Sequence, residues 1–157
     1  MLTYDKRGNA ILEAEARIPY ELAKGPTWSK FFKGFKDKKI LGTRCPKCNR
    51  VLVPARSFCP ACFVDMDEWV EVSQKGVIQT WVRTDHAYFG MPTKPPFIHS
   101  VIKLEGTDCG FIHLIGGFEI GDIREVRKII PTGKTVKAVW NTERSGCIMD
   151  IKYFEPV

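Results

Sequence analysis

Two cysteine pairs with the same internal spacing constrain this chain more than any other feature. The segments Cys45-Pro46-Lys47-Cys48 and Cys59-Pro60-Ala61-Cys62 are separated by ten residues. A two-residue gap lets one tight turn direct both sulfurs of a pair at one ion, and ten residues suffice for a hairpin that places the second turn opposite the first. Four thiolates in a tetrahedral array suit zinc, and the same geometry also suits iron. The spacing therefore predicts one metal site formed by Cys45, Cys48, Cys59 and Cys62.

Such a site is expected to stabilise the fold and to take no part in catalysis. Four protein ligands leave no coordination position for water or substrate. Metal binding to sites of this kind supplies about 10–16 kcal/mol, enough to order a segment too small to have its own core. The alternatives are two disulfides or four ordinary buried thiols. The residues after the pairs are Asn49 and Phe63; because phenylalanine tolerates a left-handed backbone poorly, we expect the second turn to be distorted.

The chain has 157 residues, enough for one ordinary domain and a small metal module. It contains no apolar run long enough to span a membrane, and its first residues lack the basic and apolar pattern of a secretory signal. Four of the six cysteines are assigned to the metal, which leaves Cys109 and Cys147. A metal site of thiolates without an export signal favours a reducing cytoplasm as the location and no contact with membranes.

Positive charge is concentrated in one part of the chain. Between Lys24 and Arg56 there are ten lysines and arginines against a single acidic residue, Asp37. This excess favours an anionic partner such as the phosphates of a ligand, a nucleic acid or an acidic protein surface. The alternative is a solvated face that only aids solubility.

An aromatic stripe at helical spacing precedes the cysteines. Trp28, Phe31, Phe32 and Phe35 recur at i, i+3, i+4 and i+7 after Pro26 and Thr27, with lysines interleaved, which predicts an amphipathic helix. Internal packing is the ordinary role of such a stripe, and the alternative is a docking face or the wall of a pocket. The residues before this helix are expected to form an arm or a short helix without a core of its own.

After residue 66 the apolar period changes to two. Short runs rich in Val, Ile, Phe and Trp, separated by Gly, Pro, Asp and Asn, predict a small closed barrel, most simply an OB-fold, with one helical turn within 119–130. The fold class is thus mainly β with an N-terminal helix, in three parts: an arm and helix (1–41), a zinc ribbon (42–66) and an OB-fold barrel (67–157). The expected strands are Trp69–Ser73, Val77–Arg83, Ile98–Glu105, Phe111–Gly116, Thr135–Trp140 and Ile148–Phe154.

Two loops and three histidines were considered for chemistry. Loop 85–96 carries Tyr88, Phe89 and Met91 and is predicted to contact a ligand or a partner, the alternative being a plug on the barrel mouth. Loop 105–110 is predicted to be a simple hairpin turn. No common catalytic motif accompanies the histidines, so we expect no catalytic residue in this chain alone, and packed or hydrogen-bonded roles for the two in predicted strands, His99 and His113.

Several runs resemble one known family over nearly the whole chain from about residue 14. They are Ala16-Arg17-Ile18-Pro19-Tyr20, the approach to the cysteines from Lys39 to Cys48, the run from Val53 to Cys59, and the two last strands, 136–140 and 148–154. Their order and spacing resemble the acyl-CoA-associated family with a rubredoxin-like zinc ribbon and an OB-fold, except that Asn49 replaces the glycine usual after the first pair.

The resemblance implies a small accessory subunit of a thiolase or 3-hydroxy-3-methylglutaryl-CoA synthase. The partner would hold the nucleophile and the acid–base groups, and this chain would help to hold or channel the CoA ester in a hetero-oligomer. A similar subunit accompanies the thiolase that cleaves benzoylsuccinyl-CoA, so the breakdown of an aromatic or fatty acyl-CoA is an expected setting. The candidate CoA contacts are four cations for the phosphates and two aromatic rings for apolar contact: Lys36, Lys39, Arg44, Arg56, Phe32 and Phe35.

Three other functions fit parts of the sequence. A barrel with a zinc ribbon and a basic surface is also typical of modules that bind single-stranded nucleic acid, although here the basic residues lie outside the predicted barrel strands. Iron in the cysteine site would indicate an electron carrier. An independent CoA-ester hydrolase or transferase would need a nucleophile and base that the sequence does not display.

Overall fold

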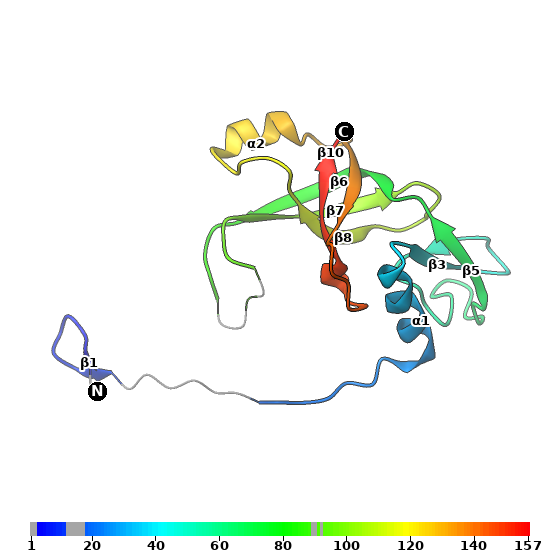
Figure 1. The fold of residues 1–157 in the computed structure, drawn as a ribbon, viewed down its shortest axis with the longest axis horizontal. Coiled ribbons are helices and arrows are strands. Elements are labelled where there is room, and N and C mark those ends of the chain that lie inside the picture. The colour runs from blue at the N-terminus through cyan, green and yellow to red at the C-terminus, as the bar shows by residue number, and fades with distance from the viewer. Residues whose placement is uncertain (1–2, 12–17, 89–90, 92) are drawn as a thin grey trace.

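The computed structural model describes residues 3–11, 18–88, 91 and 93–157 (Figure 1). The described chain forms a small N-terminal hairpin, a helix packed on a three-stranded sheet, and a five-stranded barrel. In chain order the elements are β1 (Thr3–Tyr4), β2 (Ala10–Ile11), α1 (Gly25–Lys36), β3 (Ile40–Arg44), β4 (Val51–Leu52), β5 (Glu68–Val72), β6 (Lys75–Thr84), β7 (Phe97–Leu104), β8 (Phe111–Ile115), α2 (Ile123–Ile129), β9 (Thr135–Trp140), a 3₁₀ turn (Ile148–Asp150) and β10 (Ile151–Pro156).

The barrel is closed in the order β10-β8-β7-β6-β9. Its neighbouring strands are antiparallel except for β10 and β8, which run parallel, and α2 lies between the third and fourth barrel strands along the chain. This order is that of an OB-fold, as the sequence predicted. The barrel core consists of alternate inward side chains, among them Ile78, Ile98, Ile102, Phe111 and Phe154, each at most 1% exposed.

The sheet of the cysteine module has the order β4-β3-β5 and takes in one strand that the sequence had placed in the barrel. The strand predicted over Trp69–Ser73 is β5, and it pairs along its whole length with β3, from Ile40 opposite Val72 to Arg44 opposite Glu68. Its assignment to the barrel was therefore wrong. A period of two predicts a strand but not its partner, because pairing depends on where the chain returns in space.

Helix α1 joins the cysteine module to the barrel. Phe31 and Phe35 are buried, and the Phe35 ring lies 5.7 Å from that of Trp140 on β9. Gly34 lets the helix approach β3, since a β-carbon there would meet Leu41 at 3.0 Å. The aromatic stripe is thus mainly core packing. No helix in the described part of the chain is long and apolar enough to cross a membrane.

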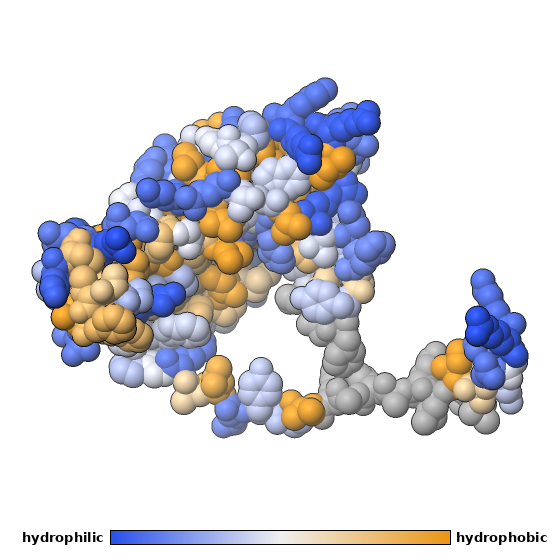
Figure 2. All heavy atoms as spheres, turned by 180° about the vertical axis from the view of Figure 1, so that it is seen from behind, coloured by the Kyte–Doolittle hydropathy of each residue, from blue (hydrophilic) through white to orange (hydrophobic). Residues whose placement is uncertain are grey.

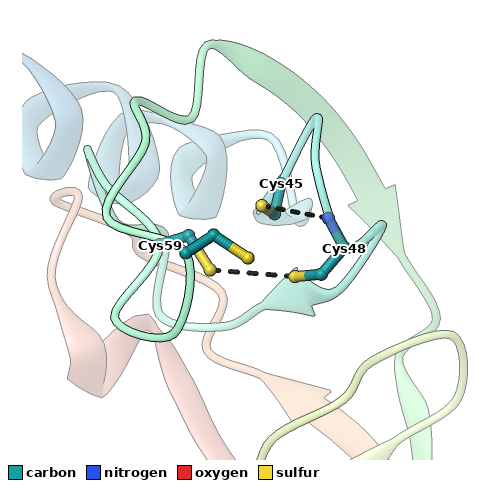
Figure 3. Close-up of side chains that lie close together, drawn as sticks. Cys45, Cys48 and Cys59 are labelled. Atoms are coloured by element: carbon teal, nitrogen blue, oxygen red, sulfur yellow. Dashed lines mark hydrogen bonds between the residues drawn. The ribbon is translucent and has the colours of Figure 1, made fainter.

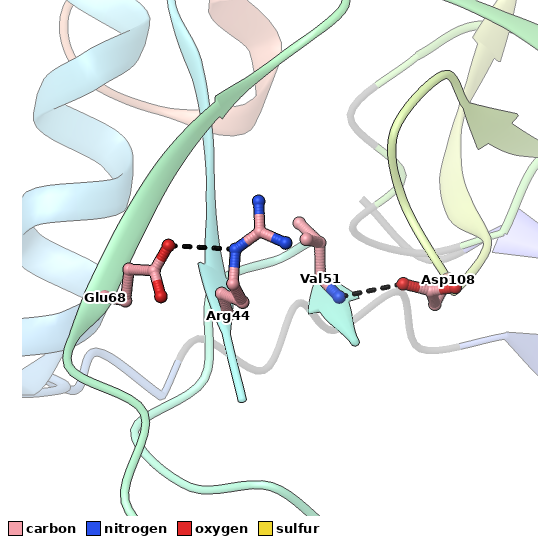
Figure 4. A network of polar contacts seen from close by, with 4 residues as sticks. All are labelled: Arg44, Val51, Glu68 and Asp108. Atoms are coloured by element: carbon pink, nitrogen blue, oxygen red, sulfur yellow. Dashed lines mark hydrogen bonds and ion pairs between the residues drawn. The ribbon is translucent and has the colours of Figure 1, made fainter. Parts of the chain in front are cut away.

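The hairpin between β7 and β8 ties the barrel to the cysteine module. Asp108 and Val51 exchange two hydrogen bonds of 2.9 Å, one through the Asp108 carboxylate and one between backbones (Figure 4). The Cys109 thiol accepts from the Val53 N–H at 3.1 Å and donates to the Val53 carbonyl at 3.2 Å. The loop predicted as a simple turn is therefore a docking element, which the sequence could not indicate because its partners lie more than fifty residues away.

The segment before α1 extends away from the rest of the molecule (Figure 1). Residues 18–24 have no regular secondary structure. Ile18, Tyr20 and Leu22 are 83%, 82% and 75% exposed, so alternate apolar side chains face solvent. This agrees with the expected arm, although residues 12–17 lie outside the described part.

A buried carboxylate organises the loop before β10. Asp150, 3% exposed, accepts hydrogen bonds from the backbone N–H groups of Ser145, Gly146 and Cys147 at 3.0, 2.7 and 3.2 Å. Burial by itself raises the pKa of Asp150, but these three donors outweigh it and hold the pKa below its usual value.

We expect Asp150→Asn to lower the free energy of unfolding by about 2 kcal/mol at neutral pH, because a charged acceptor of three N–H groups is lost. A carboxyl whose pKa is lower in the folded state stabilises the fold above its unfolded pKa of about 4, and this contribution disappears as the pH falls through the folded pKa. Urea unfolding of both proteins should therefore show a difference that shrinks towards about pH 3. An unchanged difference across that range would contradict this role of the ionised carboxylate.

Candidate metal centre and adjacent cavities

The four predicted ligands converge on one point. The Sγ atoms of Cys45, Cys48, Cys59 and Cys62 all lie within 4.8 Å of one another, and those of Cys48 and Cys59 are 3.8 Å apart (Figure 3). Four sulfurs at about 2.3 Å from a tetrahedral zinc ion are separated by about 3.8 Å. None of the six cysteines forms a disulfide in the described chain. The cluster fits a structural zinc ion, as the cysteine spacing predicted, and the alternative of two disulfides does not agree with the free thiols.

Both cysteine turns have the same backbone form. The N–H of Asn49 donates to the Cys45 carbonyl and that of Phe63 donates to the Cys59 carbonyl, each at 2.9 Å. Asn49 has φ 58° and Phe63 has φ 54°, so both are left-handed. The expectation of a distorted second turn was therefore wrong. The Phe63 side chain is 82% exposed and meets no packing constraint, while closure around one ion fixes the backbone of the turn.

The pKa values of the cluster's thiols indicate that a bound cation would stabilise it. Burial raises the pKa of the Cys45 thiol, but backbone N–H groups of Cys48 and Lys47 lower it to about 7. Hydrogen bonding to Cys48, followed by burial, raises the pKa of Cys62 to about 12. The protein alone thus favours one thiolate and disfavours another beside it. A bound divalent cation removes this conflict, because coordination deprotonates thiols outright.

Residues 32–68 match the family model described as the ChsH2 rubredoxin-like zinc ribbon domain. This segment is a rubredoxin-like zinc ribbon. The ribbon spans the four cysteines and ends at the first residue of β5. No curated protein sequence matches the chain.

Two solved structures share the fold of the ribbon and barrel together. One is a protein of unknown function from the DUF35 family of Sulfolobus solfataricus, 24% identical, with a TM-score of 0.58 over 84% of each chain. The other is the Ltp2-ChsH2(DUF35) aldolase, 17% identical, with a TM-score of 0.60 over 89% of this chain and 98% of that chain. The predicted combination of a rubredoxin-like zinc ribbon and an OB-fold barrel is thereby confirmed.

The structure separates the residues predicted to contact CoA. Arg44 on β3 pairs with Glu68 on β5 at 2.9 Å (Figure 4). Lys39, just before β3, pairs with Glu71 on β5, also at 2.9 Å. Lys36 is the last residue of α1, and its carbonyl accepts a hydrogen bond from Arg144. These three cations line neither of the cavities beside α1.

The predicted contact between Phe35 and CoA is wrong. Its side chain is 0% exposed and packs inside the core against Phe31 and Trp140, so it is not available to a ligand. Helical spacing placed Phe32 and Phe35 on the same stripe. Only the packing shows that Phe32 lies at the edge of that stripe and Phe35 at its centre.

Two cavities meet beside α1 and share Trp28 and Pro54. The first, of about 560 Å³, lies between the start of α1 and the ribbon loop that follows β4; its lining includes Lys24, Arg56 and Phe58. The second, of about 330 Å³, is almost wholly apolar; its lining includes Phe31, Phe32, Phe111, Ile112 and Ile148. The structure thus brings Arg56 and Phe32, from the predicted set, to two adjoining cavities of different character.

Sequence reasoning missed Lys24, Trp28 and Phe58 as site residues. Lys24 was counted only in the basic stretch, and its Nζ lies 4.5 Å from the centroid of the Phe32 ring. Trp28 was assigned to the helix stripe, yet it is 47% exposed. Thr43 holds the Arg56 backbone in place through hydrogen bonds to both its N–H and its carbonyl. No local pattern in the sequence links these residues.

The remaining candidates take packing roles or lie partly outside the described residues. His113 is 4% exposed, its Nε2 lies 3.0 Å from the Ile148 carbonyl, and burial lowers its pKa, as expected of a packed histidine. Tyr88 is 66% exposed. Phe89, Gly90 and Pro92 lie outside the described residues, so the contact predicted for this loop stays a prediction.

Proposed function

We propose that this chain is an accessory subunit that binds a thiolase-fold enzyme and helps to hold its acyl-CoA substrate. The observation that carries the proposal is the pair of cavities joined at Trp28 and Pro54, one basic and aromatic, the other apolar. An acyl-CoA has the same two-part character, with phosphates and an adenine at one end and an apolar acyl group at the other. Aromatic and fatty acyl groups both match the apolar cavity.

The basic cavity offers several attractions to phosphates. Lys24 and Arg56 supply formal charge, and the guanidinium of Arg56 suits paired phosphate oxygens. The first turn of α1 contains no acidic residue, and no side chain of the described residues caps its N–H groups. The positive end of the helix dipole is therefore open to an anion. Trp28 and Phe58 provide faces on which an adenine ring stacks.

A partner is supported by the solved relative and by the arm. The aldolase of similar fold is named as a complex of Ltp2 with the ChsH2 DUF35 protein. In this chain Ile18, Tyr20 and Leu22 expose alternate apolar side chains beyond the body of the protein. Covering such exposed apolar side chains with another surface lowers the free energy, because it removes them from water. Free thiols outside the metal site, Cys109 and Cys147, favour a reducing cytoplasm as the setting.

The test of the partner is co-expression with candidate thiolase-fold enzymes of the same host. We expect a complex that survives gel filtration, and an enzyme that loses most of its acyl-CoA activity when separated and regains it on recombination. An enzyme that is fully active alone and does not bind this chain would overturn the proposal.

The test of the ligand site uses charge reversal at the basic cavity. We expect Lys24→Glu and Arg56→Glu each to weaken binding of coenzyme A by about tenfold, since each loses a charge-assisted contact and adds a repulsion. Isothermal titration calorimetry of the complex measures it. Lys39→Glu is the matched control, because it makes the same charge change outside both cavities; an equal loss in that variant would favour a diffuse basic surface.

A further inference from the structure

The barrel exposes one side of three neighbouring strands. Along β7 and β8 alternate side chains point into the core: Ile98, Ile102, Phe111 and Ile115 are each at most 3% exposed. The residues between them point outward, and the exposed side chains of Val82 and Ile112 show that the middle of this side is open to solvent. The outward side chains of β6, β7 and β8 therefore form a face of their own.

The strand register places the outward residues at the middle of this face in two rows, and the next row along pairs Val77 with Lys103. Directly paired residues project from the same side of a sheet with their side chains in contact. The first row is Thr80, Val101 and Ile112, and the second is Val82, His99 and Leu114; together they are the outer patch.

The outer patch is apolar and accessible. Val82 is 58% exposed and Ile112 is 65% exposed, unusually high for aliphatic residues in the middle of a sheet. A shallow cavity of about 360 Å³ runs along the patch and is lined by Thr80, Val101 and their neighbours. Hydrophobic atoms gather across one side of the body in the space-filling view (Figure 2).

The composition of the patch selects the class of partner. Its six residues are four aliphatic residues, one threonine and one histidine, and charged side chains lie at its border: Lys103 in the next row, and Arg83 and Arg127 in the cavity beside Thr80 and Val82. OB-folds that bind single strands use this same face, with cations for the phosphates and aromatic rings for the bases. A neutral aliphatic face offers neither. It fits an apolar protein surface, because only apolar contact offsets the cost of removing it from water.

We infer that the outer patch is the surface on which the partner enzyme docks, and that docking covers the apolar cavity beside α1. This inference rests on the proposed function. Its second part follows from Ile112, which lines both the shallow cavity of the outer patch and the apolar cavity next to Phe32 and Trp28. A protein seated over Ile112 therefore closes the open side of the cavity proposed for the acyl group.

The experiment places a charge in the patch. Val82→Asp and Ile112→Asp are each expected to weaken binding of the co-expressed thiolase-fold enzyme by about tenfold or more, because a carboxylate would be buried unpaired in the interface. Val157→Asp is the matched control, since it makes the same change on an exposed valine that follows β10 and lies outside the three strands of the patch. Val82→Thr, which keeps the shape and replaces one methyl group by a hydroxyl, is expected to weaken binding less than Val82→Asp. Surface plasmon resonance measures the affinities, and thermal melting and zinc content confirm that each variant is folded.

The outcomes separate this inference from the proposed function. Suppose that the wild-type chain binds the enzyme and that both aspartate variants and Val82→Thr bind it equally well. This result would overturn the docking surface and leave the proposed function intact. No binding by the wild-type chain would overturn both. A homodimer that Val82→Asp dissociates, with enzyme binding unaffected, would reassign the patch to a second copy of this chain and so overturn the inference.

Discussion

Replacing both buried metal ligands, Cys45 and Cys59, by serine is expected to abolish zinc binding and unfold the ribbon. Ion binding to four cysteines supplies about 10–16 kcal/mol in small metal domains, which is comparable with the whole stability of an ordinary protein. The ribbon has only a small core of its own, formed by the cysteines with Leu52 and Met66. Without the ion it retains too few apolar contacts to hold its turns together.

Zinc per chain by elemental analysis and thermal unfolding by circular dichroism measure this effect. The control is Cys147→Ser, because Cys147 lies outside the cluster and its thiol donates to the Asp150 carboxylate at 3.4 Å, a bond that a serine hydroxyl can also make. We expect the control to keep one zinc ion and nearly the wild-type melting temperature. A double variant that remains folded without metal would show that the ion is dispensable, and bound iron with a red colour would instead favour an electron carrier.

Phe35→Ala is expected to have the second largest effect, a loss of about 3–5 kcal/mol, because a fully buried ring is replaced by a cavity. The ring contacts Phe31 on the same helix and Trp140 on β9, with centroids 4.9 and 5.7 Å away. Its removal therefore loosens α1 from the barrel. In a chain of this length such a loss lowers the melting temperature by about 10 °C or more.

Trp28→Ala is the control for that variant, since Trp28 lies seven residues earlier on the same helix but is 47% exposed. We expect it to change the melting temperature little and to weaken coenzyme A binding, whereas Phe35→Ala acts on stability. The reverse result, a stable Phe35→Ala protein with weakened coenzyme A binding, would return Phe35 to the ligand site.

Local patterns predicted the elements well. The cysteine spacing predicted the metal ligands, because a tight turn directs two thiols separated by two residues at the same ion. The aromatic stripe predicted α1, whose observed span, Gly25–Lys36, begins two residues before the expected start. Strands β6 to β9 match the predicted runs to within a few residues. The last run, predicted as a strand over 148–154, forms a 3₁₀ turn at 148–150 and becomes a strand, β10, only from Ile151.

Contacts between distant segments escaped prediction. The strand Glu68–Val72 joined the ribbon sheet, and loop 105–110 docked on Val51 and Val53. Both depend on hydrogen bonds between segments far apart in the chain, made by backbone groups and, in the loop, also by the Asp108 carboxylate and the Cys109 thiol. Backbone groups are common to all residues, and neither side chain indicates its distant partner, so these contacts leave no trace in composition or periodicity.

The sequence by itself determined the metal ligands, the helix and the alternation that builds the barrel, because each depends on spacings of a few residues. Only the tertiary structure decided that Phe35 is buried, that Lys24 and Arg56 share a cavity, and that the outer rows of β6, β7 and β8 remain uncovered. Burial and convergence depend on how whole elements pack against each other, and that packing is settled by the summed contacts of the entire core.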